Sequence, residues 1–505
     1  MSGLGQPGVI AVKWSVFSTG ARFLLQLVAQ VILARTLGPE IFGVFAIGMV
    51  VLTFAAFASG FGFSWSLLQR VTLRDEDIRF AWTWQVLVGL MTMVAVYFLA
   101  PIFAAYFNEP RAQPVIEWLA VACLLSAAAS PATYLLQRDL NFRAVGLIQI
   151  GSYAVGYLMV GVPMALLGWG SGSLVAAWLV QASVVLIASY ALKPHAVRPL
   201  FWYHDATSAV GTGRAVFFTN IVNWLLNNLD RVLIGRMLNA QALGLYNLAY
   251  NLATMPNSLL LGALQPAFLA AGARLHSELP RMGRAYIQML ATVFVLGFPA
   301  FVFMALISKD LVRLLYGPQW SEAAWVLEIL FLSMPAYVIW GLSTPVLWNT
   351  GRKYQECLLQ LPLLAGGALA FFMLAEQGIR TAAVVAACLL VSRGIVIGMA
   401  AMAALNLRLT LLFPHIARSL MLSALTAAGA LAGQKLVASF DLPLLSLGAS
   451  SLTALVLVAT TIAIRPQVLG DDTGAMLIRF FPGLASVLNR HRQAIPSDGF
   501  GEQLP

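Results

Sequence analysis

The sequence predicts an all-α integral membrane protein with about fourteen transmembrane helices. Its 505 residues are 60% hydrophobic and only 10% charged, whereas a soluble globular chain carries about 25% charged residues. The mean hydropathy is +0.83. One globular core could not bury this much apolar surface, so we expect the chain to cross a membrane many times.

The individual helices follow from the apolar runs, because a spanning helix requires about 20 mostly apolar residues. The first run contains Lys13 and has no small-residue cleavage site behind it, so we expect a retained helix and not a removed signal. The expected spans are 11–35, 41–66, 80–105, 115–136, 143–167, 172–192, 214–237, 243–269, 284–307, 323–348, 355–375, 380–405, 416–435 and 442–464.

The charged residues indicate the orientation of these helices. Of the 30 Lys and Arg residues, 20 lie in the loops on one side and 7 on the other. Positive loops remain in the cytoplasm, so both termini are expected there. This topology accounts for the net charge of +10, and no basic block indicates a nucleic-acid partner.

Several function classes lack their characteristic motifs. Cys123, Cys357 and Cys388 are isolated, and the five histidines form neither a metal pair nor a Ser/His/Asp arrangement. The chain also has no GxxxxGK[ST] phosphate loop. We therefore do not expect the chain itself to be an ATPase, and we expect no catalytic residues, no metal and no cofactor.

An internal repeat divides the chain. Residues 32–48 resemble residues 233–249 at an offset of 201, and six expected helices separate equivalent points, so both copies have the same orientation. The matched pairs include Arg35 with Arg236 and Gly43 with Gly244. The predicted domains are an N-terminal lobe (1–200), a C-terminal lobe (201–410), two further helices (411–465) and a cytoplasmic tail (466–505).

A polar stripe follows the first helix of each lobe, because steps of three and four residues share one helix face. Two such faces would line a central cavity. Hydrogen bonding that holds helices together, worth about 0.6–2 kcal/mol per bond, is the alternative for the amides. The candidates are Ser15, Arg22, Gln26 and Gln30 in the first stripe; Asn220, Asn223, Asn227, Asp230 and Arg231 in the second; and Tyr250 in the next helix.

The charges inside the helices suggest an anionic ligand. Arg22, Arg231 and Arg393 are three intramembrane cations, and Asp230 is the one clear acid. A pyrophosphate matches the planar, bidentate donors of arginine. Pairing of Asp230 with an arginine remains the alternative. Glu356, near the inner end of its helix, is expected at the solvated interface.

Two segments are expected not to span. Residues 309–320 are short and amphipathic and predict an interfacial elbow. In the tail, apolar residues from Met476 to Leu488 fall near helical spacing with arginines close by, which is typical of a segment lying on an anionic leaflet. A loosely ordered tail is the alternative.

Three segments carry a resemblance to a known family: residues 227–269, 314–330 and 346–354. They resemble the polysaccharide transporter branch, which includes O-antigen and exopolysaccharide flippases, of the multidrug/oligosaccharidyl-lipid/polysaccharide (MOP) exporter superfamily. The resemblance implies a MATE-like fold in the bacterial inner membrane, with two parallel six-helix lobes plus two C-terminal helices. It also implies alternating access coupled to an ion gradient, either H+ or Na+.

The same resemblance implies a substrate and partners. The substrate would be an undecaprenyl-pyrophosphate-linked oligosaccharide, moved to the periplasmic face for lipopolysaccharide O-antigen, capsule or exopolysaccharide biosynthesis. Membrane lipids, a polysaccharide polymerase and a chain-length regulator would be its partners. The expected cavity residues are Arg22, Gln26, Gln30, Asn223, Asn227, Asp230, Arg231, Tyr250 and Arg393, the last without motif support.

Two other functions stay open. A MATE-like multidrug or cation exporter should have an acidic cavity, whereas this one is net basic. A polysaccharide polymerase should have a sizeable outer loop, which the expected spans do not leave room for.

Overall fold

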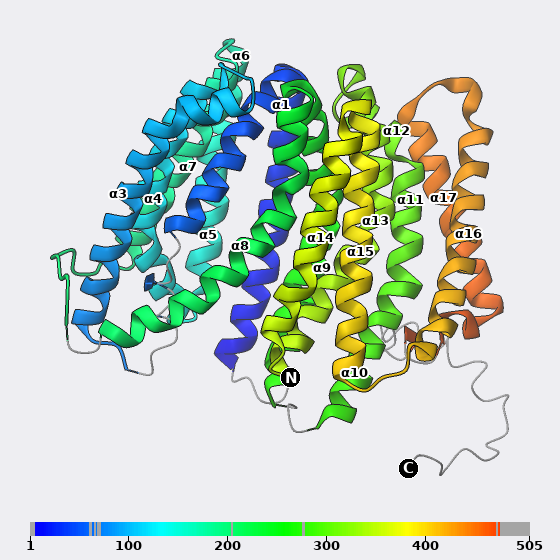
Figure 1. Cartoon of the computed structure of the whole chain (residues 1–505). Coiled ribbons are helices and arrows are strands. Elements are labelled where there is room, and N and C mark those ends of the chain that lie inside the picture. Colours follow the sequence, from blue (N-terminus) through cyan, green and yellow to red (C-terminus); the bar gives the residue numbers. More distant parts are fainter. Residues whose placement is uncertain are drawn as a thin grey trace. The chain divides into compact units, whose positions relative to one another are not determined.

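The structure is a computed structural model that describes residues 6–59, 63–64, 67, 72–203, 206–274, 278–470 and 473–474. All regular elements in these ranges are helices, as Figure 1 shows. The side chains of Ser15 and Asn220, and the tail segment from Met476 to Leu488, lie outside the described part of the chain.

Eleven helices in the described ranges are long and apolar enough to cross a membrane. One of them, α1 (Gln6–Ser59), holds two of the expected spans, because its backbone breaks at Gly38 (φ 75°) just before Pro39. Two more long helices follow: α8 (Ala206–Met237) carries the second stripe, and α9 (Ala240–Arg274) carries Tyr250. Together these helices confirm an all-α membrane fold with about fourteen spans.

The remaining elements follow in chain order. They are α3 (Asp75–Tyr106), α4 (Ala112–Arg138), α5 (Phe142–Tyr153), η1 (Ala154–Gly161), α6 (Val162–Leu166), α7 (Ser171–Leu192), α10 (Leu279–Thr292), η2 (Val293–Gly297), α11 (Phe298–Leu306), α12 (Ser308–Leu315), η3 (Pro318–Trp320), α13 (Ser321–Asn349), α14 (Lys353–Leu374), η4 (Ala375–Gln377), α15 (Ile379–Ala404), η5 (Leu409–Leu412), α16 (Phe413–Leu436), η6 (Ala438–Phe440), α17 (Pro443–Ile464) and η7 (Pro466–Leu469).

Two spans contain a π-helical segment. The first runs through α5, η1 and α6, and the second through α10, η2 and α11. Each segment ends just before a proline, Pro163 or Pro299. Proline cannot donate the next backbone hydrogen bond, and a locally widened helix accommodates that loss.

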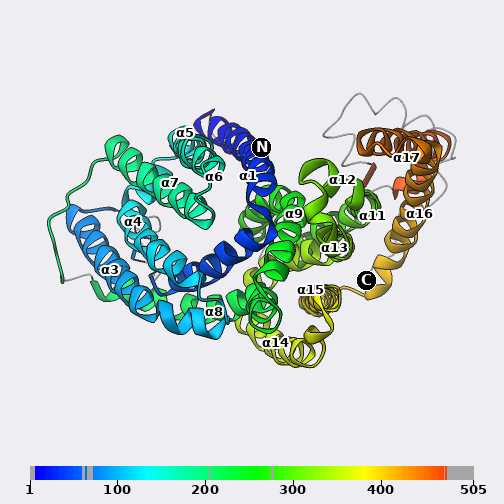
Figure 2. The ribbon, with the colours of Figure 1, turned by 90° about the horizontal axis from the view of Figure 1, so that it is seen from above.

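The helices group into two compact units. Unit 1 comprises Met1–Leu259, Leu315–Val326 and Cys357–Leu389, and unit 2 comprises Leu260–Leu314, Leu327–Glu356 and Leu390–Pro505. Within unit 1, α4 and α5 pack against α1, and α7 packs against α4, as Figure 2 shows from above. The lobes expected at 1–200 and 201–410 were defined by the internal sequence repeat, and this division of the chain stays a prediction.

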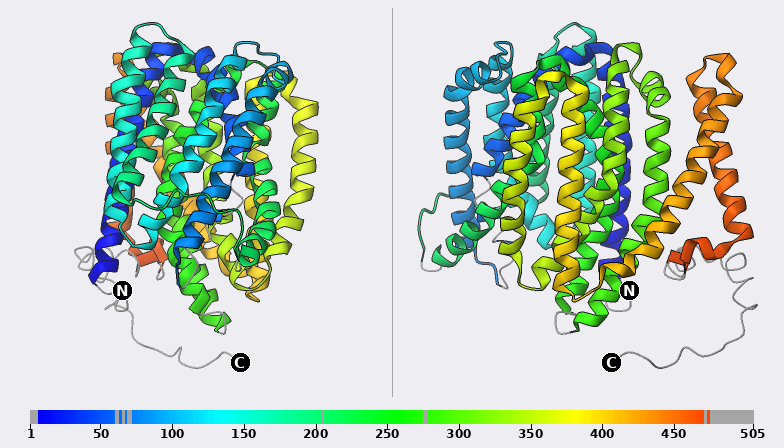
Figure 3. Two further views of the ribbon diagram at one scale, coloured as in Figure 1. Left: turned by 90° about the vertical axis from the view of Figure 1, so that its left-hand side faces the viewer. Right: turned by 45° about the vertical axis from the view of Figure 1, so that its right-hand side comes forward.

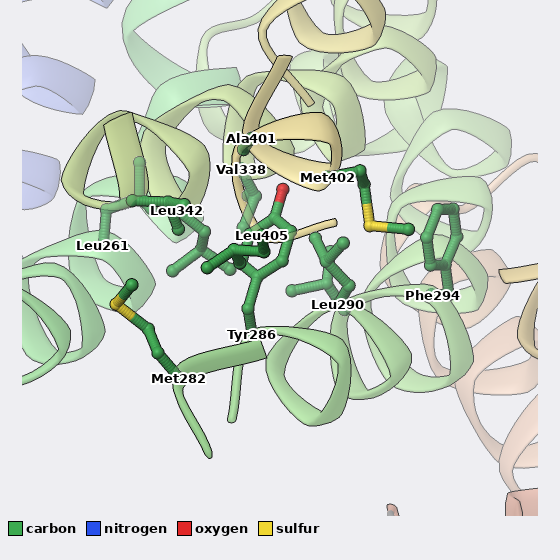
Figure 4. Packing of buried hydrophobic residues seen from close by; sticks show 12 residues of the cluster. Leu261, Met282, Tyr286, Leu290, Phe294, Val338, Leu342, Ala401, Met402 and Leu405 are labelled. Atoms are coloured by element: carbon green, nitrogen blue, oxygen red, sulfur yellow. The ribbon is translucent and has the colours of Figure 1, made fainter. Parts of the chain in front are cut away.

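Unit 2 has a core between α10, α13 and α15. Tyr286, Leu342 and Met402 are buried there (Figure 4). The Tyr286 hydroxyl lies 2.7 Å from the Ser343 hydroxyl. The hairpin of α16 and α17 follows α15 in the chain (Figure 3) and packs through Gly429 and Gly433 of α16. Small residues allow such close approach of membrane helices.

Candidate functional site

Arg22 lies on α1 within unit 1, where α5 supplies its neighbour. Its Nη1 atom is 3.5 Å from Gln149 Oε1, which is the outer limit of a hydrogen bond. Its Nε atom is buried and has no hydrogen-bond partner among the described residues. No carboxylate in the described part of the chain lies within ion-pair distance of this guanidinium, so its charge and one donor remain for another group.

Two stacked tyrosines accompany Arg22. The rings of Tyr153, the last residue of α5, and Tyr157 in η1 lie 4.4 Å apart and are nearly parallel, at 10°. Both rings pack in a buried cluster with Leu25, Ala29 and Leu33 of α1, the helix that carries Arg22. The side of α5 and η1 that packs against α1 therefore carries an amide and two tyrosines.

Sequence reasoning missed these three residues. Gln149, Tyr153 and Tyr157 recur at steps of four, which places them on one helix face. A glutamine inside an otherwise apolar span was the signal that could have found them. Their neighbour Arg22 is 127 residues from Gln149 along the chain, so periodicity alone could not have joined them.

The rest of the first stripe continues along α1. Gln26 and Gln30 follow Arg22 at successive turns, and both side chains are half-buried. Their role in binding substrate stays a prediction.

A second cluster joins α8 to α9 around Asp230. The Tyr246 hydroxyl donates to Asp230 Oδ2, and the backbone N–H of Arg231 donates to Asp230 Oδ1 at 2.8 Å. Pairing of Asp230 with an arginine stays a prediction, because the hydrogen bonds described for its carboxylate come from a tyrosine and a backbone N–H. Adjacent side chains point about 100° apart around a helix, which turns the Arg231 guanidinium away from its neighbour.

Arg231 instead contacts uncharged groups. Its Nη1 atom donates to Asn228 Oδ1 at 3.2 Å, and its guanidinium lies 4.2 Å from the centroid of the Tyr250 ring. A cation over an aromatic face is favourable by about 0.5–2 kcal/mol. Like Arg22, Arg231 has a buried Nε atom that no described residue accepts from.

The two stripe arginines have different hydrogen-bond partners. Arg22 contacts Gln149 of α5, whereas Arg231 donates to Asn228 of its own helix, α8. Asn223 and Asn227 are half-buried on α8 and lie one to two turns before Asp230. The structure therefore shows two basic clusters in unit 1, one on α1 with α5 and one on α8 with α9.

Arg393 belongs to unit 2, whereas every other candidate lies in unit 1. It is 2% exposed on α15, and its guanidinium lies 3.7 Å from the centroid of the Trp340 ring of α13. This contact satisfies part of its charge without an acid. Its assignment to a substrate cavity remains a prediction.

The expected position of Glu356 at a solvated interface is wrong. The side chain is fully buried, and its carboxylate accepts hydrogen bonds from Thr344 Oγ1 at 2.9 Å and Trp348 Nε1 at 2.8 Å. The last turns of α13 supply both donors, because residues four apart share one helix face. Local hydropathy at the start of α14 gave no sign of these donors.

Comparison with known proteins places these features in context. Residues 32–325 match the model of a family described as polysaccharide biosynthesis protein. The lipopolysaccharide biosynthesis protein WzxC of Escherichia coli (strain K12) is 26% identical over 340 residues, which cover 65% of this chain and 67% of the relative. The succinoglycan biosynthesis transport protein ExoT of Rhizobium meliloti (strain 1021) is 27% identical over 378 residues, covering 74% and 73%.

Solved structures share the fold at low sequence identity. The lipid II flippase MurJ in an inward closed conformation matches with a TM-score of 0.69 and 11% identity, covering 90% of this chain and 99% of that chain. An inward-facing multidrug resistance MATE family transporter matches with a TM-score of 0.62 and 13% identity, covering 76% and 94%. The expected MATE-like fold is thus confirmed.

Proposed function

This chain belongs to the polysaccharide biosynthesis protein family, and we propose that it carries undecaprenyl-pyrophosphate-linked oligosaccharide units across the bacterial inner membrane. It is a multi-pass membrane flippase and not an enzyme. The observation that carries the choice of substrate is the pair of arginines in unit 1. Arg22 and Arg231 lie inside membrane helices, contact uncharged side chains, and each keep a buried Nε donor without a described partner.

The Arg22 cluster is the proposed pyrophosphate site. A cation at membrane depth costs about 2.5–3.5 kcal/mol on insertion scales, so its presence needs a compensating anion or a wet cavity. A phosphate oxygen can accept from the Nε and Nη atoms of one guanidinium together. Gln149 would hold the guanidinium in place, and the Tyr153 and Tyr157 hydroxyls would donate to the remaining phosphate oxygens.

The amide stripes are the proposed contacts for sugars. Sugar hydroxyls both donate and accept, and the amide groups of Gln26, Gln30, Asn223 and Asn227 offer both functions. Such side chains tolerate different sugars better than a fixed array of charges would. Tyr250, stacked beneath Arg231, would contribute an aromatic face to the same path.

We propose that a proton or sodium gradient drives the cycle. Asp230 is the proposed carboxyl for proton coupling, because it is buried in α8 and bonded to the neutral Tyr246 hydroxyl. The excess of Lys and Arg on one side supports cytoplasmic termini. A polymerase and a chain-length regulator are the proposed partners that use the exported units.

The test is the fate of the lipid-linked unit in cells that lack this protein. We expect complete repeat units to accumulate on the inner leaflet and surface polymer to disappear, with both effects reversed by the intact gene. Normal export with altered polymer length would indicate polymerisation instead. Loss of organic-cation efflux with normal polymer would indicate a multidrug exporter. Collapsing the proton gradient and the sodium gradient separately identifies the coupling ion.

A further inference from the structure

The break in α1 leaves backbone acceptors that the helix cannot satisfy itself. In a regular helix the Arg35 carbonyl would accept from residue 39, but residue 39 is proline and has no N–H. Gly38 adopts φ 75° and ψ 173°, so the chain after it leaves the helical path and cannot supply the donors of a following helical turn. The end of the helix that carries Arg22 therefore needs donors from elsewhere.

Those donors come from a segment nearly 300 residues further along the chain. Gln319 Nε2 donates to the Ala34 carbonyl at 3.1 Å and to the Arg35 carbonyl at 3.0 Å. Trp320 Nε1 donates to the Ala34 carbonyl at 3.0 Å. The Trp320 side chain is fully buried, and its ring packs edge-on against Phe42 at 5.5 Å, beyond the break.

The capping is mutual. Arg35 Nε donates at 2.8 Å to the carbonyl of Leu315, the last residue of α12. Arginine is favourable at a helix C-terminus, where the carbonyl groups carry partial negative charge. The C-terminus of α12 and the broken end in α1 thus each receive side-chain donors from the other.

The second copy of the repeat does not depend on a distant segment in this way. There Asn239 stands at the position of Gly38, and its Oδ1 atom accepts from the Ala242 backbone N–H at 2.8 Å. Ala240 stands at the position of Pro39 and retains its N–H. Among the described residues, no distant side chain donates to the matching carbonyls of Gly235 and Arg236, so the remote cap is found in the first copy.

The segment that supplies the remote cap is connected at both ends to the other unit. Leu315–Val326 belongs to unit 1, but the chain on either side of it, ending at Leu314 and resuming at Leu327, belongs to unit 2. Gly317 has φ 90°, a conformation open chiefly to glycine. The Tyr316 hydroxyl is buried with no described hydrogen-bond partner, which costs about 1–3 kcal/mol in this state.

We propose that the segment from Leu315 to Trp320 is a latch, and that Gln319 and Trp320 are positioning residues for the helix that carries Arg22. While closed, the latch fixes the Gly38 end of that helix, which the proposed topology places on the periplasmic side. Release of its hydrogen bonds lets that end separate from the elbow as the lobes move. The inference rests on the proposed alternating-access function.

A labelling experiment tests the latch without measuring transport. Gln30→Cys is introduced into full-length protein whose Cys123, Cys357 and Cys388 are replaced by serine, and intact cells are treated with a membrane-impermeant maleimide. Adding Gln319→Ala or Trp320→Phe should raise the labelling rate roughly fivefold to tenfold, as expected for the loss of one net hydrogen bond. Trp118→Phe, at a side chain 63% exposed on α4, is the matched control and should leave the rate unchanged.

A reversible cross-link tests whether the contact must open. Arg35→Cys with Leu315→Cys, joined by a short cleavable bifunctional thiol reagent, should stop export until a reductant cleaves the linker. The control pair Arg313→Cys with Asp441→Cys replaces an exposed ion pair of 2.7 Å in unit 2 and should export equally before and after cross-linking.

Undiminished export with the first pair cross-linked would overturn the latch, as would an unchanged labelling rate in both capping variants at normal protein levels. Neither outcome depends on whether Arg22 binds pyrophosphate, so failure of the latch and failure of the proposed substrate site are distinguishable.

Discussion

Gly43 of α1 and Gly244 of α9 pack against each other's helices in a reciprocal way. A Cβ atom on Gly43 would overlap the carbonyl of Ala240, and one on Gly244 would overlap the carbonyl of Pro39. Ala240 follows Pro39 by the same 201 residues that separate the two glycines. Exchange of equivalent contacts is the mark of a two-fold relation, so the crossing supports the repeat found in the sequence.

This crossing should be intolerant of any side chain. Gly43→Ala or Gly244→Ala places a methyl group against backbone atoms, which cannot move aside by changing rotamer. Either substitution should destabilise the protein by about 1–3 kcal/mol. The measurement is thermal unfolding in detergent together with the amount of folded protein in the membrane. Gly366→Ala on α14, which has no atom near its Cβ position, is the control and should unfold at the wild-type temperature or slightly above it.

The bond between Tyr246 and Asp230 should show as a coupling between the two residues. Tyr246→Phe removes a donor from a buried carboxylate and should cost about 1–3 kcal/mol of stability. In the Asp230→Asn background, Tyr246→Phe should lower the stability by less, because a neutral amide loses less than a buried carboxylate when the hydroxyl donor is removed. A double-mutant cycle on thermal stability measures the difference, and strictly additive effects would show that the bond is not formed.

An ion pair in the loop that connects α3 to α4 should make the stability of the protein depend on pH under acidic conditions. Arg111 donates to both oxygens of Glu109, at 2.7 and 3.0 Å, and these bonds hold the pKa of Glu109 below its ordinary value. The stabilisation is therefore present above the ordinary glutamate pKa and is lost as the pH falls through the lowered one. Thermal unfolding of wild type and Arg111→Gln should differ slightly at pH 7 and converge near pH 3. A gap that persists at pH 3 would mean that another contact of Arg111 causes it.

The sequence predicted the helices well because membrane spans have a physical signature of their own. Runs of about 20 apolar residues were enough to place the spans, including the separation of 11–35 from 41–66 within α1. The polar stripes were visible because helical periodicity brings residues such as Arg22 and Gln26 to one face. Each of these inferences uses residues that lie close together in the chain.

Contacts between distant helices could not be predicted in this way. Gln149 meets Arg22, and Gln319 meets Ala34, only because the tertiary fold brings separate helices together. The hydrogen-bond donors that make burial of Glu356 possible come from the neighbouring α13. Hydropathy around Glu356 does not include them and therefore suggested an exposed position. A polar residue in an apolar span, such as Gln149, marks a candidate, but periodicity within one helix does not identify its partner on another helix.

The central claim is that Arg22 binds the pyrophosphate of the transported lipid, and export by Arg22→Ala tests it most directly. Loss of charge-assisted hydrogen bonds should lower the rate of polymer export by one to two orders of magnitude at normal protein levels. Arg22→Lys should restore only part of it, because an ammonium cannot form the bidentate contact. The control Arg198→Ala, at an exposed loop arginine, should export normally. Wild-type export by Arg22→Ala would contradict the account.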